Sequence, residues 1–349
     1  MAYTTIDDPT IHFKTLLYTG NGSSGHSITG VGFQPDWVWI KNREQSYSHF
    51  LTDVVRGVTK ELYTDSTGSE YTRSNGLTAF GADGFTVGDN NGHNQNGNSL
   101  VSWNWKAGNS SGSSNGDGSI SSTVTANTTA GFSIVKYTGT GSNATVGHGL
   151  GAVPQMTIIK GMTNSYNWGV YHHKLGNQKN LNLNTSGAAN NDSGGVYYNS
   201  TTPTSTVFSI GTNVGYNASS ADYIAYCFSE KQGYSKFGSY EGNGNADGAY
   251  VHLGFRPGFI MIKKSSGTED WSMYDSKRNV NGTTNTLPLL ANFNDAESGL
   301  TGKNMDILSN GVKMKTSNGE LNLSGATYIY MAFAESPFVN SNGVPNNAR

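Results

Sequence analysis

Short apolar stretches, separated by runs of Gly, Ser, Asn and Thr, make up almost the whole chain. The clearest is DWVWIK, in which Trp37 and Trp39 alternate with Val38 and Ile40. Successive residues of a strand point to opposite sides, so a strand of this sequence is apolar on both faces. No long segment with a helical apolar period interrupts the pattern, and we therefore predict an all-β protein.

The same pattern occurs three times along the chain. Residues 18–57, 137–176 and 240–279 align without a gap, and each begins with Tyr-x-Gly. A proline and then a lysine follow at fixed spacing: Pro35 and Lys41, Pro154 and Lys160, Pro257 and Lys263. An aromatic strand closes each copy, as SLVSWNW, YIAYCF or YIYMAF. A unit of about 100 residues has the size of a domain, and we predict three tandem antiparallel β-sandwich repeats.

The composition places the boundaries of these repeats. We predict an N-terminal arm at 1–12, repeat 1 at 13–107, a Gly/Ser linker at 108–117, repeat 2 at 118–232, repeat 3 at 233–337 and a loose tail at 338–349. Asp83-Gly84 and Asn310-Gly311 predict hairpins, because these dipeptides favour two-residue turns.

The strand that is apolar on both faces recurs in every repeat. The counterparts of Trp37 and Trp39 are Met156 and Ile158 in repeat 2 and Phe259 and Met261 in repeat 3. We interpret these six residues as an interface face, since large apolar patches are rarely left exposed. Two explanations stay open: loops of the same repeat cover the second face, or a neighbouring repeat or another copy of the chain does.

Charge and cysteine content exclude several classes of partner. Charged residues make up 13% of the chain, and 22 Lys and Arg against 24 Asp and Glu give a net charge of −2. No basic block predicts a nucleic-acid partner, and no apolar run approaches the roughly 20 residues of a membrane span. The single cysteine, Cys227, lies in an apolar run and is expected to be buried. The start, MAYTTIDDPT, lacks the basic and apolar parts of a secretory signal.

Candidate catalytic groups are exchanged between the repeats. Asp53 aligns with His172 and Asp275, and Arg56 aligns with Leu175 and Arg278. A catalytic group placed by the scaffold would not vary in this way, so we expect no enzyme and no cofactor. Carboxylate pairs such as those at 269–270 and 7–8 are interpreted as solvated loop groups.

Two loop regions deserve a binding hypothesis. Asp89–Gly97, DNNGHNQNG, is rich in oxygen ligands but lacks the carboxylate spacing of a calcium loop, so we expect a hairpin loop and no metal. Tyr197, Tyr198 and Tyr216 lie in polar contexts. They are suited either to stacking on sugar rings or to packing in the core, and both interpretations stay open.

Repeat 1 as a whole resembles a known protein family. Its segments HFKTLLYTGNG, GFQPDWVWIKNR, HFLTDVVRG, FTVG and SWNWKAG are similar to a domain of appendage and structural proteins of tailed bacteriophages, especially marine ones such as cyanophages. Repeats 2 and 3 diverge from it, lacking the paired tryptophans and the WNWKAG ending.

The resemblance implies a role in the virion, with assembly in the host cytoplasm. It favours a tail fibre or adhesin that presents a host-receptor-binding surface, with a capsid decoration protein as the alternative. It further implies a homotrimer, other virion proteins as partners of the N-terminal arm, and a host surface glycan or protein as receptor. It supplies no catalytic residues.

Overall fold

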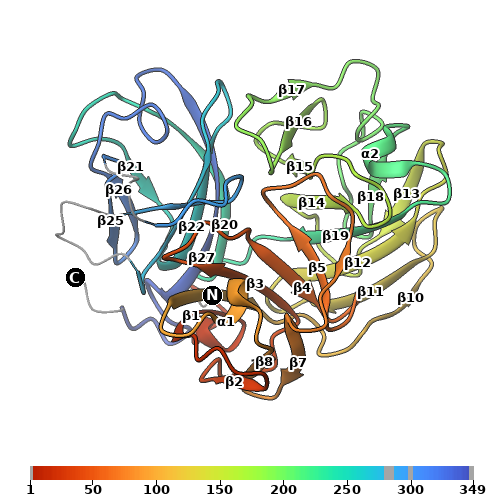
Figure 1. The fold of residues 1–349 in the computed structure, drawn as a ribbon. Helices are drawn as coiled ribbons and strands as arrows, with labels where there is room; N and C mark the ends of the chain where they lie inside the picture. Colours follow the sequence, from red (N-terminus) through yellow and green to blue (C-terminus); the bar gives the residue numbers. More distant parts are fainter. Residues whose placement is uncertain (1–2, 279–286, 298–301, 346–349) are drawn as a thin grey trace.

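The chain folds almost entirely into antiparallel strands, as the composition predicts. The computed structural model describes residues 3–278, 287–297 and 302–345, and Figure 1 shows the ribbon. Apart from the short elements η1 (Pro9–Ile11), α1 (Asn91–Asn94) and α2 (Val214–Asn217), its regular elements are strands. High Gly, Asn and Ser content with β-branched and aromatic residues accounts for this, because it favours turns and strands over helices.

Repeat 1 contains two sheets. The larger has the strand order β1-β9-β3-β4-β5-β6 and the smaller the order β2-β8-β7. Their bounds are β1 (Phe13–Thr19), β2 (His26–Thr29), β3 (Trp37–Asn42), β4 (Phe50–Asp53), β5 (Lys60–Tyr63), β6 (Tyr71–Thr72), β7 (Leu77–Gly81), β8 (Gly84–Val87) and β9 (Ser99–Trp105).

Repeat 2 has a similar arrangement, with two strands added at one edge of its larger sheet and one strand fewer in its smaller sheet. Its larger sheet runs β10-β11-β12-β19-β14-β15-β16-β17, and β13 pairs with β18. The bounds are β10 (Ser113–Asn115), β11 (Ser122–Asn127), β12 (Phe132–Thr138), β13 (Ala144–Gly147), β14 (Met156–Gly161), β15 (Gly169–His172), β16 (Lys179–Asn182), β17 (Asn190–Asn191), β18 (Val207–Ile210) and β19 (Asp222–Phe228).

Repeat 3 has the strand order of repeat 1, except that its larger sheet contains five strands among the described residues. Its sheets run β20-β27-β22-β23-β24 and β21-β26-β25. The bounds are β20 (Ser235–Glu241), β21 (Tyr250–His252), β22 (Phe255–Lys264), β23 (Trp271–Asp275), β24 (Leu289–Leu290), β25 (Met305–Leu308), β26 (Gly311–Met314) and β27 (Thr327–Pro337). The proline-led strands β3, β14 and β22 therefore hold the same place, each between the closing aromatic strand and the next hairpin strand.

The three repeats lie around a common centre. In Figure 1, repeat 1 is red to orange at the bottom, repeat 2 yellow to green on the right and repeat 3 blue on the left, with their larger sheets facing inward. A hydrophobic cluster in this centre takes residues from all three repeats, whereas three further clusters each belong to one repeat. Every repeat thus contributes to one shared core and keeps a core of its own.

Alternation along β3 divides its residues between these cores. Trp37 and Trp39 belong to the shared core, and Val38 and Ile40 to the core between the two sheets of repeat 1. All four side chains are at most 1% exposed. The face for which the sequence left two explanations open is covered by neighbouring repeats of the same chain.

The predicted hairpins form, but their glycines lie in the second strand of each hairpin and not in the two-residue loop. The two-residue loops are 82–83 and 309–310, and Gly84 and Gly311 begin the second strands. A Cβ on Gly84 would lie 2.0 Å from the carbonyl oxygen of Ile28, and one on Gly311 would lie 2.2 Å from that of Val251. Glycine is required there because a neighbouring strand passes close to the backbone.

The connecting and terminal segments are more ordered than their composition suggests. In the expected linker, Ser113–Asn115 pairs with β11 as an edge strand. In the expected arm, the Thr4 hydroxyl donates to Gln232 O, and Ile6 is buried in the shared core. In the expected tail, the Ser341 amide and hydroxyl both donate to the Asp7 carboxylate. Residues 346–349 of the tail and position 279 of the third aligned segment lie outside the described residues.

No helix of the described part of the chain is long and apolar enough to cross a membrane.

Candidate functional site

The six residues predicted as an interface face lie together in the shared core. Trp37, Trp39, Met156, Ile158, Phe259 and Met261 all belong to this one cluster. The Trp37 ring stacks on Tyr226 of repeat 2 at a centroid distance of 4.4 Å. The Trp103 ring lies edge-on to Phe259 of repeat 3 at 5.7 Å. These side chains join the repeats and are not accessible to a ligand.

A buried ion pair lies at two of the three boundaries between repeats, and a side chain of the neighbouring repeat bonds to it. Asp53 and Arg56 of repeat 1 form a pair with no exposed side-chain surface, and the Tyr226 hydroxyl of repeat 2 donates to Asp53 Oδ2 at 2.8 Å. Asp275 and Arg278 of repeat 3 form the same pair. There the Trp103 indole of repeat 1 donates to Asp275 Oδ2 at 3.1 Å.

The boundary between repeats 2 and 3 has neither the Asp–Arg pair nor an aromatic hydrogen-bond donor at the equivalent positions. Register places Met331 of repeat 3 where repeats 1 and 2 have Trp103 and Tyr226. On the repeat 2 side of this boundary lie His172 and Leu175, and His172 Nε2 donates to the Tyr330 carbonyl at 3.2 Å. The exchange of Asp and Arg between repeats therefore follows the chemistry of the neighbouring repeat, which supports a structural role for these groups.

A second set of contacts runs around the ring in the opposite direction. The Trp168 indole of repeat 2 donates to Tyr63 O of repeat 1 at 2.9 Å. The Trp271 indole of repeat 3 donates to Asn182 O of repeat 2 at 3.0 Å. His49 holds the equivalent position in repeat 1 and faces the backbone of Leu290 in repeat 3. The three repeats thus form a closed ring.

Burial lowers the pKa of His172 to about 3, with a smaller contribution from the positive charge of His173. An unfolded histidine titrates near 6.5, so between these values the unfolded chain binds the proton and the folded chain does not. We expect the free energy of unfolding to fall with decreasing pH below about 6.5, by up to about 1.4 kcal/mol per pH unit for this group. Urea titrations at several pH values measure the slope. His172→Gln should reduce it, and an unchanged slope would contradict this assignment.

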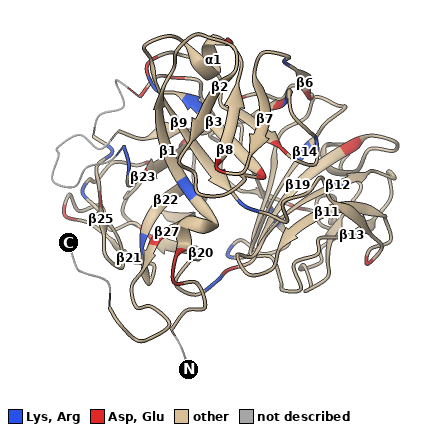
Figure 2. Cartoon of the chain, turned by 90° about the horizontal axis from the view of Figure 1, so that it is seen from below, with Lys and Arg blue, Asp and Glu red and all other residues tan. Residues whose placement is uncertain are grey.

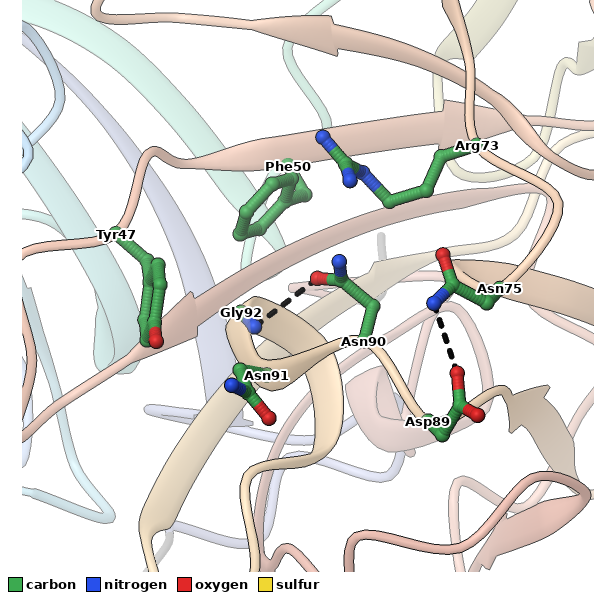
Figure 3. A pocket seen from close by; sticks show the side chains of 8 residues that line it. All are labelled: Tyr47, Phe50, Arg73, Asn75, Asp89, Asn90, Asn91 and Gly92. Atoms are coloured by element: carbon green, nitrogen blue, oxygen red, sulfur yellow. Dashed lines mark hydrogen bonds between the residues drawn. The ribbon is translucent and has the colours of Figure 1, made fainter.

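The candidate binding site is a pocket on repeat 1, drawn in Figure 3. It has a volume of about 400 Å³, within the range of small-ligand sites. Three segments form it: the loop before β4, the turn after β6, and the turn that leads into α1. Its lining includes Tyr47, Phe50, Arg73, Asn75, Asp89 and Asn91.

Aromatic and polar groups occupy different sides of this pocket. In Figure 3 the rings of Tyr47 and Phe50 lie to the left and the side chains of Arg73, Asn75 and Asp89 to the right. Asn75 Nδ2 donates to Asp89 Oδ1 at 2.7 Å. This bond leaves the second carboxylate oxygen of Asp89 and the amide oxygen of Asn75 as acceptors for a ligand.

A buried polar network fixes the floor of the pocket. Arg73 Nε donates to Glu61 Oε2 at 2.9 Å, and His93 Nε2 lies 3.0 Å from Glu61 Oε1. His93 also contacts Phe50 at a ring distance of 4.2 Å and Asn90 Oδ1 at 3.0 Å. The side chains of Glu61 and His93 have no exposed surface. The network positions Arg73 and Asn90 before any ligand arrives.

Repeat 2 has the same turn without this pocket. Asn90 and Asn213 cap α1 and α2 in the same way. Thr212 and Val214 of repeat 2 are therefore the equivalents of Asp89 and Asn91 in repeat 1. The polar pair that lines the pocket of repeat 1 is therefore absent from repeat 2.

The tyrosines expected as sugar-stacking candidates fill this region of repeat 2. Tyr198 and Tyr216 are 3% exposed, and both hydroxyls donate to Asn180 Oδ1. The Tyr216 ring fits there because residue 169 is glycine, where repeat 1 has Phe50. A Cβ at this position would collide with the ring. Of the two interpretations, core packing holds for Tyr198 and Tyr216, and Tyr197 is half-buried beside them.

The comparison with protein families decides the family of the chain. Residues 8–337 match a domain of unknown function, DUF7483. The chain belongs to the DUF7483 family. No curated protein and no solved structure matches it. The matched DUF7483 region spans all three repeats, as does the shared core.

The remaining sequence candidates of this DUF7483 protein take structural positions. The expected hairpin loop at Asp89–Gly97 is wrong: the segment contains α1 and joins β8 of the smaller sheet to β9 of the larger sheet. Cys227 is buried as a free thiol. The described residues contain no group of three or more His, Cys, Asp or Glu side chains suited to hold a metal ion.

One signal in the DUF7483 sequence was missed. Asn-x-x-x-Asn precedes every closing strand, at 90–94, 213–217 and 318–322. Its second asparagine is fully buried in each repeat, and its amide group donates to two or more oxygens of neighbouring turns. This motif marks the turn that carries the pocket in repeat 1.

Proposed function

We propose that the protein is a carbohydrate-binding component of a bacteriophage virion, of the tail fibre or adhesin type. In this proposal, three copies of one β-sandwich form a ring, and the pocket of repeat 1 binds a saccharide of the host surface. The phage part of the proposal rests on the resemblance of repeat 1 to virion proteins.

The pocket of repeat 1 is the observation that carries the proposal. A saccharide presents an apolar C–H face and a set of hydroxyls that both donate and accept hydrogen bonds. Tyr47 offers a partly exposed ring for the first. Asn75, Asp89 and Asn91 offer acceptors and donors for the second.

The polar groups of the pocket favour binding over bond cleavage. Glycosidases use two carboxyl groups on either side of the scissile bond. Among the lining residues, Asp89 alone carries a carboxylate, and Glu61, which bonds the lining residue Arg73, is itself buried beside His93. This supports a binding protein that leaves its glycan intact.

The surface and the ring fit a particle component. Figure 2 shows Lys, Arg, Asp and Glu scattered along the chain, with no large region of one sign. Attraction of a charged polymer is therefore a poor explanation for binding. The apolar faces meet inside one chain, so a trimer of chains would have to use other surfaces.

The experiment replaces two pocket residues by those that repeat 2 carries. The variant Asp89→Thr/Asn91→Val should fold normally, because Thr212 and Val214 occupy the same turn. Loss of two hydrogen bonds should weaken glycan binding about 10- to 100-fold. A glycan array followed by calorimetric titration of the best ligand measures this, and host-cell binding should fall in parallel.

Asp117→Thr is the matched control for this variant. Asp117 is exposed and accepts a hydrogen bond from Asn115 Nδ2, as Asp89 does from Asn75, but it lies outside the pocket. The control should bind like the wild type. Wild-type protein that binds no glycan, or a pocket variant of unchanged affinity, would overturn the proposal.

A further inference from the structure

A groove beside β20 in repeat 3 forms a second, separate recess. It has a volume of about 370 Å³ and lies between the edge strands β20 and β21. Repeat 2 contributes His173 and Lys174 to its rim. In repeat 2 itself, β11 pairs with the equivalent edge of β12, so no such groove opens there.

A tyrosine and a glycine that occur together only in repeat 3 shape this groove. Tyr330 faces Gly238 across the pair β20–β27. The equivalent pairs are Val135 with Ala225 in repeat 2 and Leu16 with Ser102 in repeat 1. A Cβ on Gly238 would lie 2.2 Å from the Tyr330 hydroxyl, so the absence of a side chain there gives the ring its path to the groove.

The Tyr330 hydroxyl lines the groove and has no hydrogen-bond partner among the described residues. Tyr330 is only 4% exposed, and burial raises the pKa of its hydroxyl well above the ordinary value. The hydroxyl oxygen is not among the fully buried side-chain atoms that lack a partner, so it opens to the groove. A tyrosine hydroxyl that bonds no protein group and faces a groove can both donate a hydrogen bond to a ligand and accept one from it.

The other groups of the groove select the kind of ligand. Phe237 turns its amide and carbonyl outward, where Glu230 and His173 already bond them at 3.1 and 2.7 Å. A peptide strand would therefore find no continuous ladder to extend along β20. Ser239 follows in the same outward orientation, and the exposed Tyr250 ring borders the groove. Separate hydrogen-bonding groups beside an aromatic ring suit a polyhydroxylated ligand.

We propose that this groove is a second saccharide-binding site. The proposal takes its ligand class from the proposed function, but it depends on different residues. Two sites on one rigid ring would let a single chain hold a repetitive glycan at two points, which raises the apparent affinity without new contacts.

The test removes the Tyr330 hydroxyl and measures saccharide contact directly. Methyl glycosides of hexoses and N-acetylhexosamines are the probes, observed by saturation-transfer NMR and titrated against the full chain. In the Asp89→Thr/Asn91→Val background, Tyr330→Phe should weaken the remaining binding about 3- to 10-fold. Its thermal stability should not fall, because the hydroxyl bonds no protein group.

Two further variants keep the result interpretable. Gly238→Val/Tyr330→Ala installs the pair that repeat 2 carries and should abolish the remaining binding in a folded protein. Tyr328→Phe is the control on the same strand: its hydroxyl donates to Gly319 O at 2.6 Å, so stability should fall while affinity stays.

The outcomes separate this proposal from the proposed function. If Asp89→Thr/Asn91→Val alone removes all saccharide contact, the second site is overturned and the first stands. If contact is lost only with the Tyr330 variants, the second site stands and the pocket of repeat 1 does not bind. Binding that survives Gly238→Val/Tyr330→Ala unchanged overturns the second site.

Discussion

Arg56→Leu should strongly destabilise the boundary between repeats 1 and 2. It leaves Asp53 buried without its cation, and removing one partner of a buried ion pair typically costs about 3–5 kcal/mol. The Tyr226 hydroxyl alone would then face the carboxylate across the boundary. Urea unfolding gives the free energy, and for a chain of this length we expect the Tm to fall by roughly 4–7 °C.

The boundary between repeats 2 and 3 indicates which further substitutions should restore the stability lost in Arg56→Leu. This boundary uses His172, Leu175 and Met331 at the equivalent positions. The triple variant Asp53→His/Arg56→Leu/Tyr226→Met copies this set and should recover most of the lost stability, since the fully buried carboxylate is removed together with its cation. Glu70, the second partner of Arg56, keeps its ion pair with Lys60. A triple variant as unstable as Arg56→Leu would show that the three positions do not act as a unit.

Trp37→Ala should weaken repeat 2 as well as repeat 1. The ring stacks on Tyr226 and lies 5.7 Å from Phe132, both in repeat 2. Truncating a buried tryptophan typically costs about 3–5 kcal/mol. Because the cavity opens in the shared core, hydrogen exchange followed by mass spectrometry should show faster exchange in β12 and β19 together with β3.

Val38→Ala is the comparison for this measurement. Val38 lies one residue away but packs in the core of repeat 1 alone. Its truncation should speed exchange in β2, β3 and β8 and leave repeat 2 nearly unchanged. Equal effects of both variants on repeat 2 would mean that the repeats unfold as one unit whichever face is damaged.

The alternating sequence of β3 contains most of what is needed to place that strand. Two apolar faces require two cores, and the prediction of a central strand follows from Trp37 to Ile40 alone. What covers the tryptophan face could not be decided, because a second copy of the chain and a second repeat offer similar apolar surfaces. Only the position of Tyr226 opposite Trp37 in space decides between them.

The pocket could not be predicted because its groups are distant in sequence. Tyr47, Asn75 and Asp89 come from three separate loops, and only the segment that begins at Asp89 stands out in the sequence. Tyr216 shows the converse: a tyrosine in a polar loop sequence is buried because residue 169 is a glycine that leaves room for its ring. A side chain that fills the space left by a glycine elsewhere in the sequence cannot be recognised from its own neighbours in the sequence.

The closed ring determines the order of events as the chain is made. The tryptophan face of repeat 1 is complete by residue 107, yet its cover from repeat 3 ends only at residue 337. At 5–20 residues per second, a ribosome needs roughly 10–50 s for this interval. During that time the indole rings of nascent repeat 1 lack their cover from repeat 3, and early docking of repeat 2 would shorten their exposure to solvent. Each of the three repeats contacts the other two, so no contact surface remains for a fourth repeat. Open solenoids differ, because repeats can be added at either end.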